Sequence, residues 1–193
     1  MNLSTLTAIS PIDGRYASKV DALRPIASEF GLMRARVEVE IAWIKSLASH
    51  PQIDEVAPLS EQAIAEIDAI VTHFSEDDGQ RVKAIERTTN HDVKAVEYFI
   101  KKKLESRPDL AQAKEFAHFA CTSEDINNLA YGLMLKGAKE DVMLPEMKEL
   151  VSLLKALAKS WKKVPLLGMT HGQPATPTTV GKELMVFVSR LER

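Results

Sequence analysis

Apolar residues recur three and four positions apart along most of the chain, which is the period of an amphipathic helix. The longest early stripe predicts one helix over about residues 20–49. A proline-containing loop follows over 50–59, and Ser60 can cap a second helix. The side chains predicted to face inward from that second helix are Ile64, Ile67, Val71 and Phe74.

The next stretch predicts two shorter helices joined by a polar run. Ser75 and Asp78 have the spacing of a capping box and open a helix that we expect to end near Arg87. Five polar residues, 88–92, precede a helix over 93–104 whose C-terminal end carries lysines that suit the helix dipole. Pro108 closes this half of the sequence.

The second half begins with a strong helix start at Thr122-Ser123-Glu124-Asp125. Apolar residues then keep helical phase from Ile126 to Trp161, and Pro145 should bend or split that helix. Its length would be about 60 Å, whereas a compact chain of this size is about 35–40 Å across. We therefore expect other helices, from other subunits, to cover it.

A final stripe of Val180, Leu184, Phe187 and Leu191 predicts a helix with Thr176 as its cap and Pro177 at its first position. The stripe is still in phase at Arg193, so we expect a helix cut short, in an N-terminal piece of a longer protein; a terminal helix that frays is the alternative. The predicted fold is all-α. A small helical domain over 1–111 precedes the first part of a long-helix bundle domain over 112–193.

Composition narrows the class of protein. The 193 residues include 25 Lys and Arg against 27 Asp and Glu, a formal net charge of −2, so no general attraction to nucleic acid is expected. The single cysteine excludes an intrachain disulfide and a Cys-based metal cage. No apolar run approaches the roughly 18 residues that span a bilayer, and no secretory signal is visible. We expect a cytoplasmic globular protein.

Three polar islands interrupt the helical pattern. Residues 10–16 end in Arg15 and Tyr16, which can hold a phosphate, although an ordinary surface turn explains the same residues. Residues 88–92 and Lys94 offer several donors to an anion at a helix N-terminus; the alternative is a plain cap by Thr89 and Asp92. Thr122 and Ser123 add hydroxyls at another helix start, where simple capping is again the alternative.

The third island, residues 170–177, contains His171 beside a glycine in a proline-stiffened turn. An imidazole titrates near neutral pH and suits proton transfer; the alternative is a histidine that bonds only the loop backbone. The five histidines form no closely spaced pair, and we expect no metal site. Phosphate-binding glycine loops and a nucleophile elbow are missing from the sequence as well.

Taken together, four segments, 10–16, 88–97, 121–128 and 170–177, closely resemble the adenylosuccinate lyases of the fumarase/aspartase superfamily. The match follows their order and spacing over essentially the whole chain. The resemblance implies an all-helical subunit, a homotetramer with shared active sites, and no metal or organic cofactor. It also implies cleavage of adenylosuccinate to AMP and fumarate, and of the related succinylated aminoimidazole carboxamide ribotide.

The same resemblance implies roles for individual residues. Arg15 and Tyr16 would bind phosphate, and His171 would be catalytic, with His91 as a second catalytic candidate. The remaining substrate-site candidates are Asn90, His91, Asp92, Lys94, Thr122, Ser123, Thr170 and Gln173. The reaction is a β-elimination, which needs donors around a carboxyl group that gains charge and a proton for the departing nitrogen; His171 is the hypothesised general acid.

One departure and two alternatives stay open. The family's Ser-rich loop, thought to carry the base, has no counterpart in these residues, so we expect this piece alone to be inactive. A sister lyase acting on another succinyl-amine is one alternative, and a non-catalytic helical scaffold that oligomerises is the other.

Overall fold

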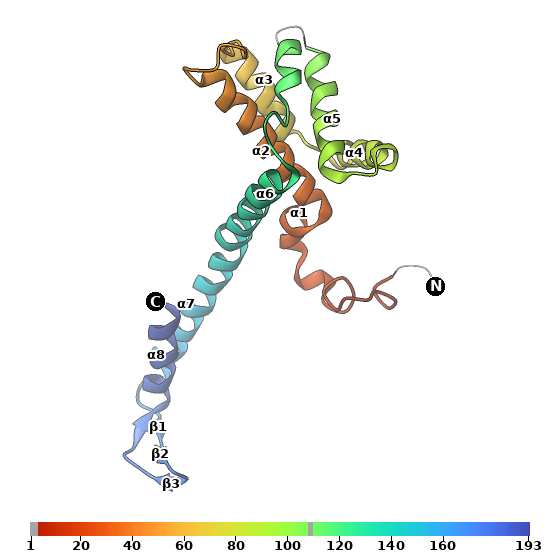
Figure 1. Cartoon of the computed structure of the whole chain (residues 1–193). Helices are drawn as coiled ribbons and strands as arrows, with labels where there is room; N and C mark the ends of the chain where they lie inside the picture. The colour runs from red at the N-terminus through yellow and green to blue at the C-terminus, as the bar shows by residue number, and fades with distance from the viewer. Residues whose placement is uncertain (1–3, 108–109) are drawn as a thin grey trace. The chain divides into compact units, whose positions relative to one another are not determined.

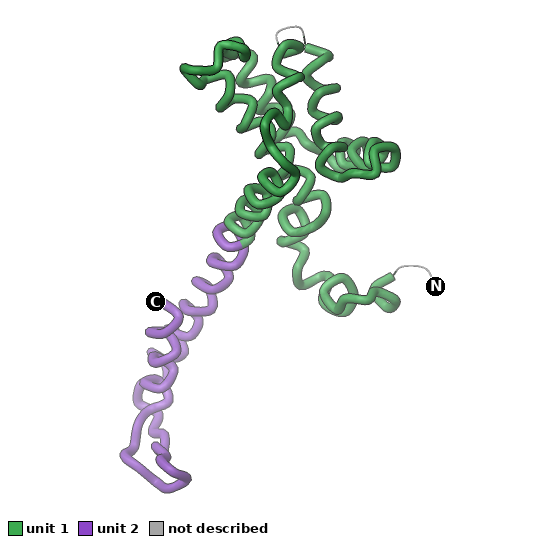
Figure 2. Tube along the Cα trace, in the orientation of Figure 1, with its two compact units in different colours: residues 1–138 green, residues 139–193 purple. Residues whose placement is uncertain are grey.

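A computed structural model describes residues 4–107 and 110–193. The chain divides into two compact units, Met1–Ala138 and Lys139–Arg193, which are shown in separate colours in Figure 2. The predicted boundary near residue 111 stays a prediction, and Pro108 lies outside the described residues.

Every regular element among the described residues of the first unit is a helix (Figure 1). Short 3-10 turns η1 (Ala17–Lys19) and η2 (Asp21–Leu23) lead into it. Its further elements are α1 (Arg24–Ala27), α2 (Glu29–Ser49), α3 (Glu61–Thr72), α4 (Glu76–Thr89), α5 (Asp92–Glu105), η3 (Ala111–Phe116) and α6 (Ser123–Gly137).

The second unit consists of two helices that are connected by a short β-ribbon. The π-helical segment η4 (Ala138–Met143) precedes α7 (Leu144–Ser160), and α8 (Val180–Leu191) follows the strands. The strands are β1 (Pro165–Leu166), β2 (Met169–Thr170), β3 (Gln173–Pro174) and β4 (Thr178–Thr179). They form two antiparallel pairs, β1 with β4 and β2 with β3. With only these two-residue strands, the all-α prediction is confirmed.

Helix α2 lies at the centre of the first unit. The main core joins α2 to α3, α4 and α5 through side chains that are almost wholly buried, among them Val37, Ile41, Ile44, Ile67 and Ile100. Phe74 lies between Phe30 and Phe99: the centre of its ring is 5.5 Å from that of Phe30 and 5.7 Å from that of Phe99. A smaller cluster joins α2 to α5 and α6 through Ala35, Val39, Val93 and Ile126. The smaller cluster therefore fixes the N-terminal ends of α5 and α6 against α2.

The single helix predicted over residues 20–49 is wrong, because the chain breaks at Ser28. Pro25 occupies the first turn of α1, where its missing N–H costs nothing. Ser28 is extended, and its hydroxyl accepts a hydrogen bond from the Gly31 N–H as the cap of α2. The apolar stripe continues through the break, so periodicity alone did not reveal it.

The caps predicted for the next two helices are confirmed. The Ser60 hydroxyl accepts from the Ala63 N–H, and Ser75 and Asp78 form a capping box. Two details differ: α4 extends beyond Arg87 to Thr89, and Ile64 is 37% exposed rather than turned inward.

The long helical run after Thr122 is divided at the place that proline predicts. Regular α-helix ends at Gly137, and a π-helical segment separates it from α7, in which Pro145 stands in the first turn. Proline lacks an N–H, and its ring clashes with the preceding turn of a helix. The π-helical segment η4 therefore lies just before Pro145.

The predicted start of the last helix is wrong. Thr178 and Thr179 pair with Leu166 and Pro165 as β4 and β1, so the chain is extended there. Helix α8 therefore begins only at Val180, with the Thr179 hydroxyl accepting from the Lys182 N–H at 3.2 Å. Thr176 and Pro177 belong to the connection before β4.

Helices α7 and α8 pack closely where α8 begins. The Gly181 N–H donates to the Trp161 carbonyl at 3.1 Å, and a Cβ at Gly181 would lie 2.3 Å from the Ala158 carbonyl oxygen. Five apolar residues of α7 remain exposed within this unit: Leu144, Met147, Leu150, Leu153 and Leu157. None of the helices in the described part of the chain has the length and apolar content that crossing a bilayer requires.

We predict that Gly181→Ala lowers the free energy of unfolding of the chain by about 1–3 kcal/mol, because the added methyl group forces the two helices apart. Gly132→Ala is the matched control, since a Cβ there meets nothing within 4 Å; it should be neutral or stabilising by up to about 1 kcal/mol. Urea denaturation measures both changes. Equal effects of the two substitutions would contradict the close approach.

Candidate functional site

The second polar island, residues 88–92, contains the short connection between α4 and α5. Asn90 ends α4 in the left-handed conformation, at φ 52°, which asparagine tolerates better than most residues. The Thr89 hydroxyl donates to the His91 carbonyl at 3.1 Å across the turn. Only Asn90 and His91 separate the two helices. Three of the five residues of the polar run, Thr88, Thr89 and Asp92, are thus helical.

His91 is the cap of α5, in place of the predicted Thr89 and Asp92. Its Nδ1 accepts a hydrogen bond from the Lys94 N–H at 3.2 Å. A neutral imidazole that accepts at Nδ1 carries its proton on Nε2. That Nε2 lies 3.4 Å from the hydroxyl of Ser123, which is 32 positions further along the chain. Backbone capping therefore aims the N–H of the imidazole at a second motif.

The segment around Ser123 begins α6 as predicted. The Thr122 N–H and hydroxyl both donate to the Asp125 carboxylate, at 2.7 and 3.0 Å. These bonds from Thr122, the backbone one first, hold the pKa of Asp125 below its ordinary value. Thr122 thus serves the cap, whereas the Ser123 side chain reaches the imidazole of His91.

A buried carboxylate on α2 fixes the turn that leads into α6. Glu40 is fully buried; its Oε2 accepts from the His118 N–H at 2.9 Å, and its Oε1 lies 2.6 Å from His118 Nδ1. Desolvation by burial raises the pKa of Glu40, and the contacts with His118 oppose that effect. His118 and Ala120 both have left-handed backbones, at φ 60° and 57°. The strained turn before Thr122 is therefore held by Glu40.

Arg36 joins the two motif helices from one turn earlier on α2. Its side chain is 5% exposed, and it donates to Asp92 Oδ2 at 2.7 Å and to Asn127 Oδ1 at 2.9 Å. Desolvation acts to raise the pKa of Asp92, but the Val93 backbone N–H and the Arg36 guanidinium bring that pKa below its ordinary value. Charged residues inside an apolar stretch of helix were the sequence signal for Arg36 and Glu40, and the pattern analysis missed both.

A pocket of about 350 Å³ lies beside His91, between α2, α4 and the start of α5. Its carboxylates are Glu29, Glu86 and Asp92, and its one cation, Arg36, is paired with Asp92. Lys83 binds both Glu29 and Glu86 at 2.6 Å. This acidic lining does not favour an anionic ligand, whereas Nε2 of His91 is directed toward the Ser123 hydroxyl.

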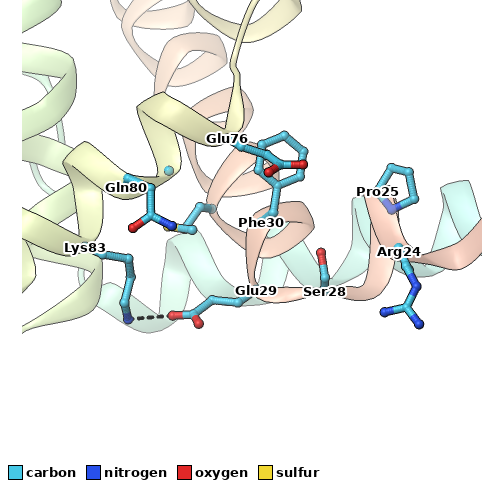
Figure 3. A pocket seen from close by; sticks show the side chains of 10 residues that line it. Arg24, Pro25, Ser28, Glu29, Phe30, Glu76, Gln80 and Lys83 are labelled. Carbon is cyan, nitrogen blue, oxygen red and sulfur yellow. Dashed lines mark hydrogen bonds and ion pairs between the residues drawn. The ribbon is translucent and has the colours of Figure 1, made fainter. Parts of the chain in front are cut away.

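A neighbouring pocket of about 370 Å³ lies where α1 and the start of α2 meet α4. Figure 3 shows the ion pair of Lys83 with Glu29 at its edge, with Gln80 and Glu76 above. Glu29 also lines the pocket beside His91. Glu29 is therefore common to both pockets.

The other predicted site residues of the first unit occupy different surroundings. The Lys94 ammonium binds the buried Glu97 at 2.7 Å and lies over the Tyr98 ring, so its charge is already compensated. The Arg15 guanidinium lies 5.6 Å from the centre of the Tyr16 ring, and both residues are exposed. In the described part of the chain Arg15 has no carboxylate partner, which leaves its charge available to an anion.

His171 occupies the tip of a hairpin in the second unit. The β2–β3 register pairs Thr170 with Gln173, which leaves His171 and Gly172 as the two turn residues, at φ 51° and 74°. Two positive φ angles are the mark of the type I′ turn that fits the twist of a hairpin. The imidazole is exposed and makes no hydrogen bond to another described residue. The alternative of a histidine bonded to the loop backbone finds no support here.

Metal-ligating side chains do not gather in the described residues: no three of the His, Cys, Asp and Glu side chains are grouped suitably for an ion.

Comparison with known proteins assigns the family. A family profile described as "Lyase" matches residues 14–193. The chain belongs to this lyase family. Adenylosuccinate lyase from Haemophilus influenzae is 58% identical over all 193 residues, and the Escherichia coli enzyme of the same name is 56% identical over the same span. The resemblance read from the four motifs is confirmed.

The lyase chain spans 42% of the length of these two relatives. Among solved structures, a fumarate lyase from a Mesorhizobium species is similar in fold, with a TM-score of 0.66 and 22% identity. That match covers 90% of this chain and 38% of the other. His91, Asp92 and Ser123 all lie within the region that matches the lyase family.

We predict that Asp92 stabilises this lyase chain only where it is ionised. Its folded-state pKa is lowered, so its contribution is fully present above the unfolded value of about 3.9 and is lost as the pH falls through the folded value. The difference in unfolding free energy between the native chain and Asp92→Asn should therefore shrink below about pH 4. Urea titrations between pH 3 and 7 measure it. A difference for Asp92→Asn that stays flat across this pH range would refute the interpretation.

Proposed function

We propose that this chain is part of a cytoplasmic enzyme that cleaves adenylosuccinate to AMP and fumarate. The same enzyme would cleave the succinylated aminoimidazole carboxamide ribotide to its amide and fumarate. The observation that carries the proposal is the 3.4 Å approach of His91 Nε2 to Ser123 Oγ, because it joins two of the four motifs. Relatives that bear the name adenylosuccinate lyase, at 56–58% identity, support the substrate class.

The reaction would be a β-elimination. A base of the full-length enzyme takes a proton from the carbon next to a carboxylate, so charge builds on that carboxyl group; the bond from the neighbouring carbon to the purine nitrogen then breaks, and the double bond of fumarate forms between the two carbons. The Nε2–H of His91 and the hydroxyl of Ser123 are donors held in advance, and donors that need no reorganisation stabilise such charge best. Asn90, Asp92, Lys94 and Thr122 would complete this side of the substrate site.

His171 would act as the general acid that protonates the departing nitrogen, with Thr170 and Gln173 contacting the substrate beside it. Its imidazole is unengaged and is carried on a turn with fixed backbone angles. Arg15 and Tyr16 would hold the phosphate, since the Arg15 charge has no partner in the described residues. The reaction needs no metal or organic cofactor, and nothing in the charge pattern suggests a nucleic-acid or membrane partner.

Assembly into a homotetramer with active sites shared between subunits is part of the proposal. The exposed apolar residues of α7, which include Leu150, Leu153 and Leu157, would be covered by helices of other subunits. Obligate interfaces are rich in such side chains.

Replacing His171 tests its role without disturbing the hairpin. His171→Asn creates the Asn-Gly pair that type I′ turns prefer, so the backbone should be unchanged. Because an amide cannot supply the proton, we predict that turnover of adenylosuccinate by the full-length protein falls about 10²–10⁴-fold. Steady-state assays measure it, with His73→Ala on the exposed end of α3 as the control. A loss below about tenfold would argue against His171 as the acid.

The substrate class is tested by assaying the full-length protein with adenylosuccinate and with argininosuccinate. We predict cleavage of the first only. Cleavage of argininosuccinate instead would favour the sister-lyase alternative. Failure to cleave either one, together with no binding of AMP or fumarate, would favour the non-catalytic scaffold.

A further inference from the structure

The Asp92 carboxylate lies between two competing partners. Its Oδ2 accepts from the Arg36 guanidinium at 2.7 Å, and its Oδ1 lies 3.7 Å from His91 Nδ1. The second distance is too long for a hydrogen bond, and His91 Nδ1 accepts from the Lys94 N–H instead. A small rotation of the carboxylate would bring it within reach of the imidazole.

Arg36 is held so that it cannot follow such a rotation. Its side chain is 5% exposed on the buried helix α2, and its Nε donates to Asn127 Oδ1 at 2.9 Å. The Asn127 amide is itself anchored by donating to Glu124 at 3.0 Å. The guanidinium is thus fixed on α5 at one end and on α6 at the other, and together with the Val93 N–H it holds the Asp92 carboxylate in one place.

The two possible tautomers of His91 differ in whether Nε2 donates or accepts a hydrogen bond. A carboxylate hydrogen-bonded to Nδ1 would place the imidazole proton there, as carboxylate partners of histidine generally do, and Nε2 would become an acceptor. With the carboxylate held away, Nδ1 accepts from the backbone, and Nε2 presents N–H toward Ser123. A donor suits an oxyanion, whereas an acceptor repels it.

We propose that Arg36 is a positioning residue which, by holding Asp92 away from His91, keeps His91 in the tautomer that points N–H at Ser123 and at the substrate. The effect of Arg36 on the His91 tautomer is inferred from the contacts above, whereas the effect on catalysis rests on the proposed function. Arg36 itself does not touch the reacting atoms in this scheme; it acts through Asp92 and His91.

The tautomer is measured directly on this 193-residue chain by two-bond ¹H–¹⁵N spectra of its histidines at neutral pH. The native chain should show His91 with the proton on Nε2, and Arg36→Met should show it on Nδ1. Arg36→Gln keeps a polar group in the buried position and should give the same change, so the test survives if Arg36→Met does not fold. In Arg36→Gln with Asp92→Asn, the competing carboxylate is gone and the proton should return to Nε2.

Lys45→Met is the matched control, because it removes a different ion pair of α2, that with Asp68 at 2.7 Å. It should leave the His91 signals unchanged. An Nδ1 proton in the native chain, or an Nε2 proton that persists in both Arg36 variants, would overturn the proposal.

Kinetics on the full-length protein test the consequence. Arg36→Gln should lower kcat for adenylosuccinate about 10- to 100-fold with a smaller change in KM, since a misplaced donor costs mainly transition-state stabilisation. Lys45→Met should retain native kcat. If the native protein does not cleave adenylosuccinate, the proposed function fails while the tautomer measurement still decides the role of Arg36. A native kcat in Arg36→Gln would overturn the catalytic part alone.

Discussion

Burial of α2 on nearly all sides is the constraint on which the first unit depends. Between Met33 and Ile44 this helix buries residues on every side except an exposed stripe of Arg34, Glu38 and Ala42, and two of the buried residues, Arg36 and Glu40, are charged. A charge inside a protein is tolerated only when it is paired and hydrogen-bonded. Arg36 meets that need through Asp92 and Asn127, and Glu40 meets it through His118. The same bonds fix the start of α5 and the segment that leads into α6. The pairing that stabilises the buried charges of α2 therefore also sets the geometry of the candidate site.

Much of the helical architecture is predictable because its causes are local. Ser60 and Ser75 cap their helices as expected, since a hydroxyl and the N–H groups it satisfies lie within one turn. Pro145 likewise marks the change from α6 to α7. The break at Ser28 escaped prediction because the apolar stripe runs through it, although the serine that caps α2 was visible. The late start of α8 escaped because a two-residue strand pair has too few residues to show alternation.

The site divides in the same way between local and long-range causes. Residue types alone identified His91, Ser123 and His171 as candidates. Their arrangement depended on facts that a sequence does not display, such as the left-handed turn at Asn90 and the approach of α6 to α5. Arg36 was overlooked because its partners are 56 and 91 positions away. A charged residue with apolar residues three and four positions away, here Leu32, Met33 and Val39, is the clue that could have found it.

The hairpin at residues 171 and 172 carries one more implication. Its backbone angles admit glycine, asparagine and aspartate readily and exclude branched side chains. Position 171 thus selects residues by shape, and the proton-donor role proposed for His171 would add a chemical demand that favours different residues. A saturation library at that codon would separate them: variants that retain the fold would be those with compatible torsion angles, and any that also retain turnover would reveal which side chains can deliver a proton.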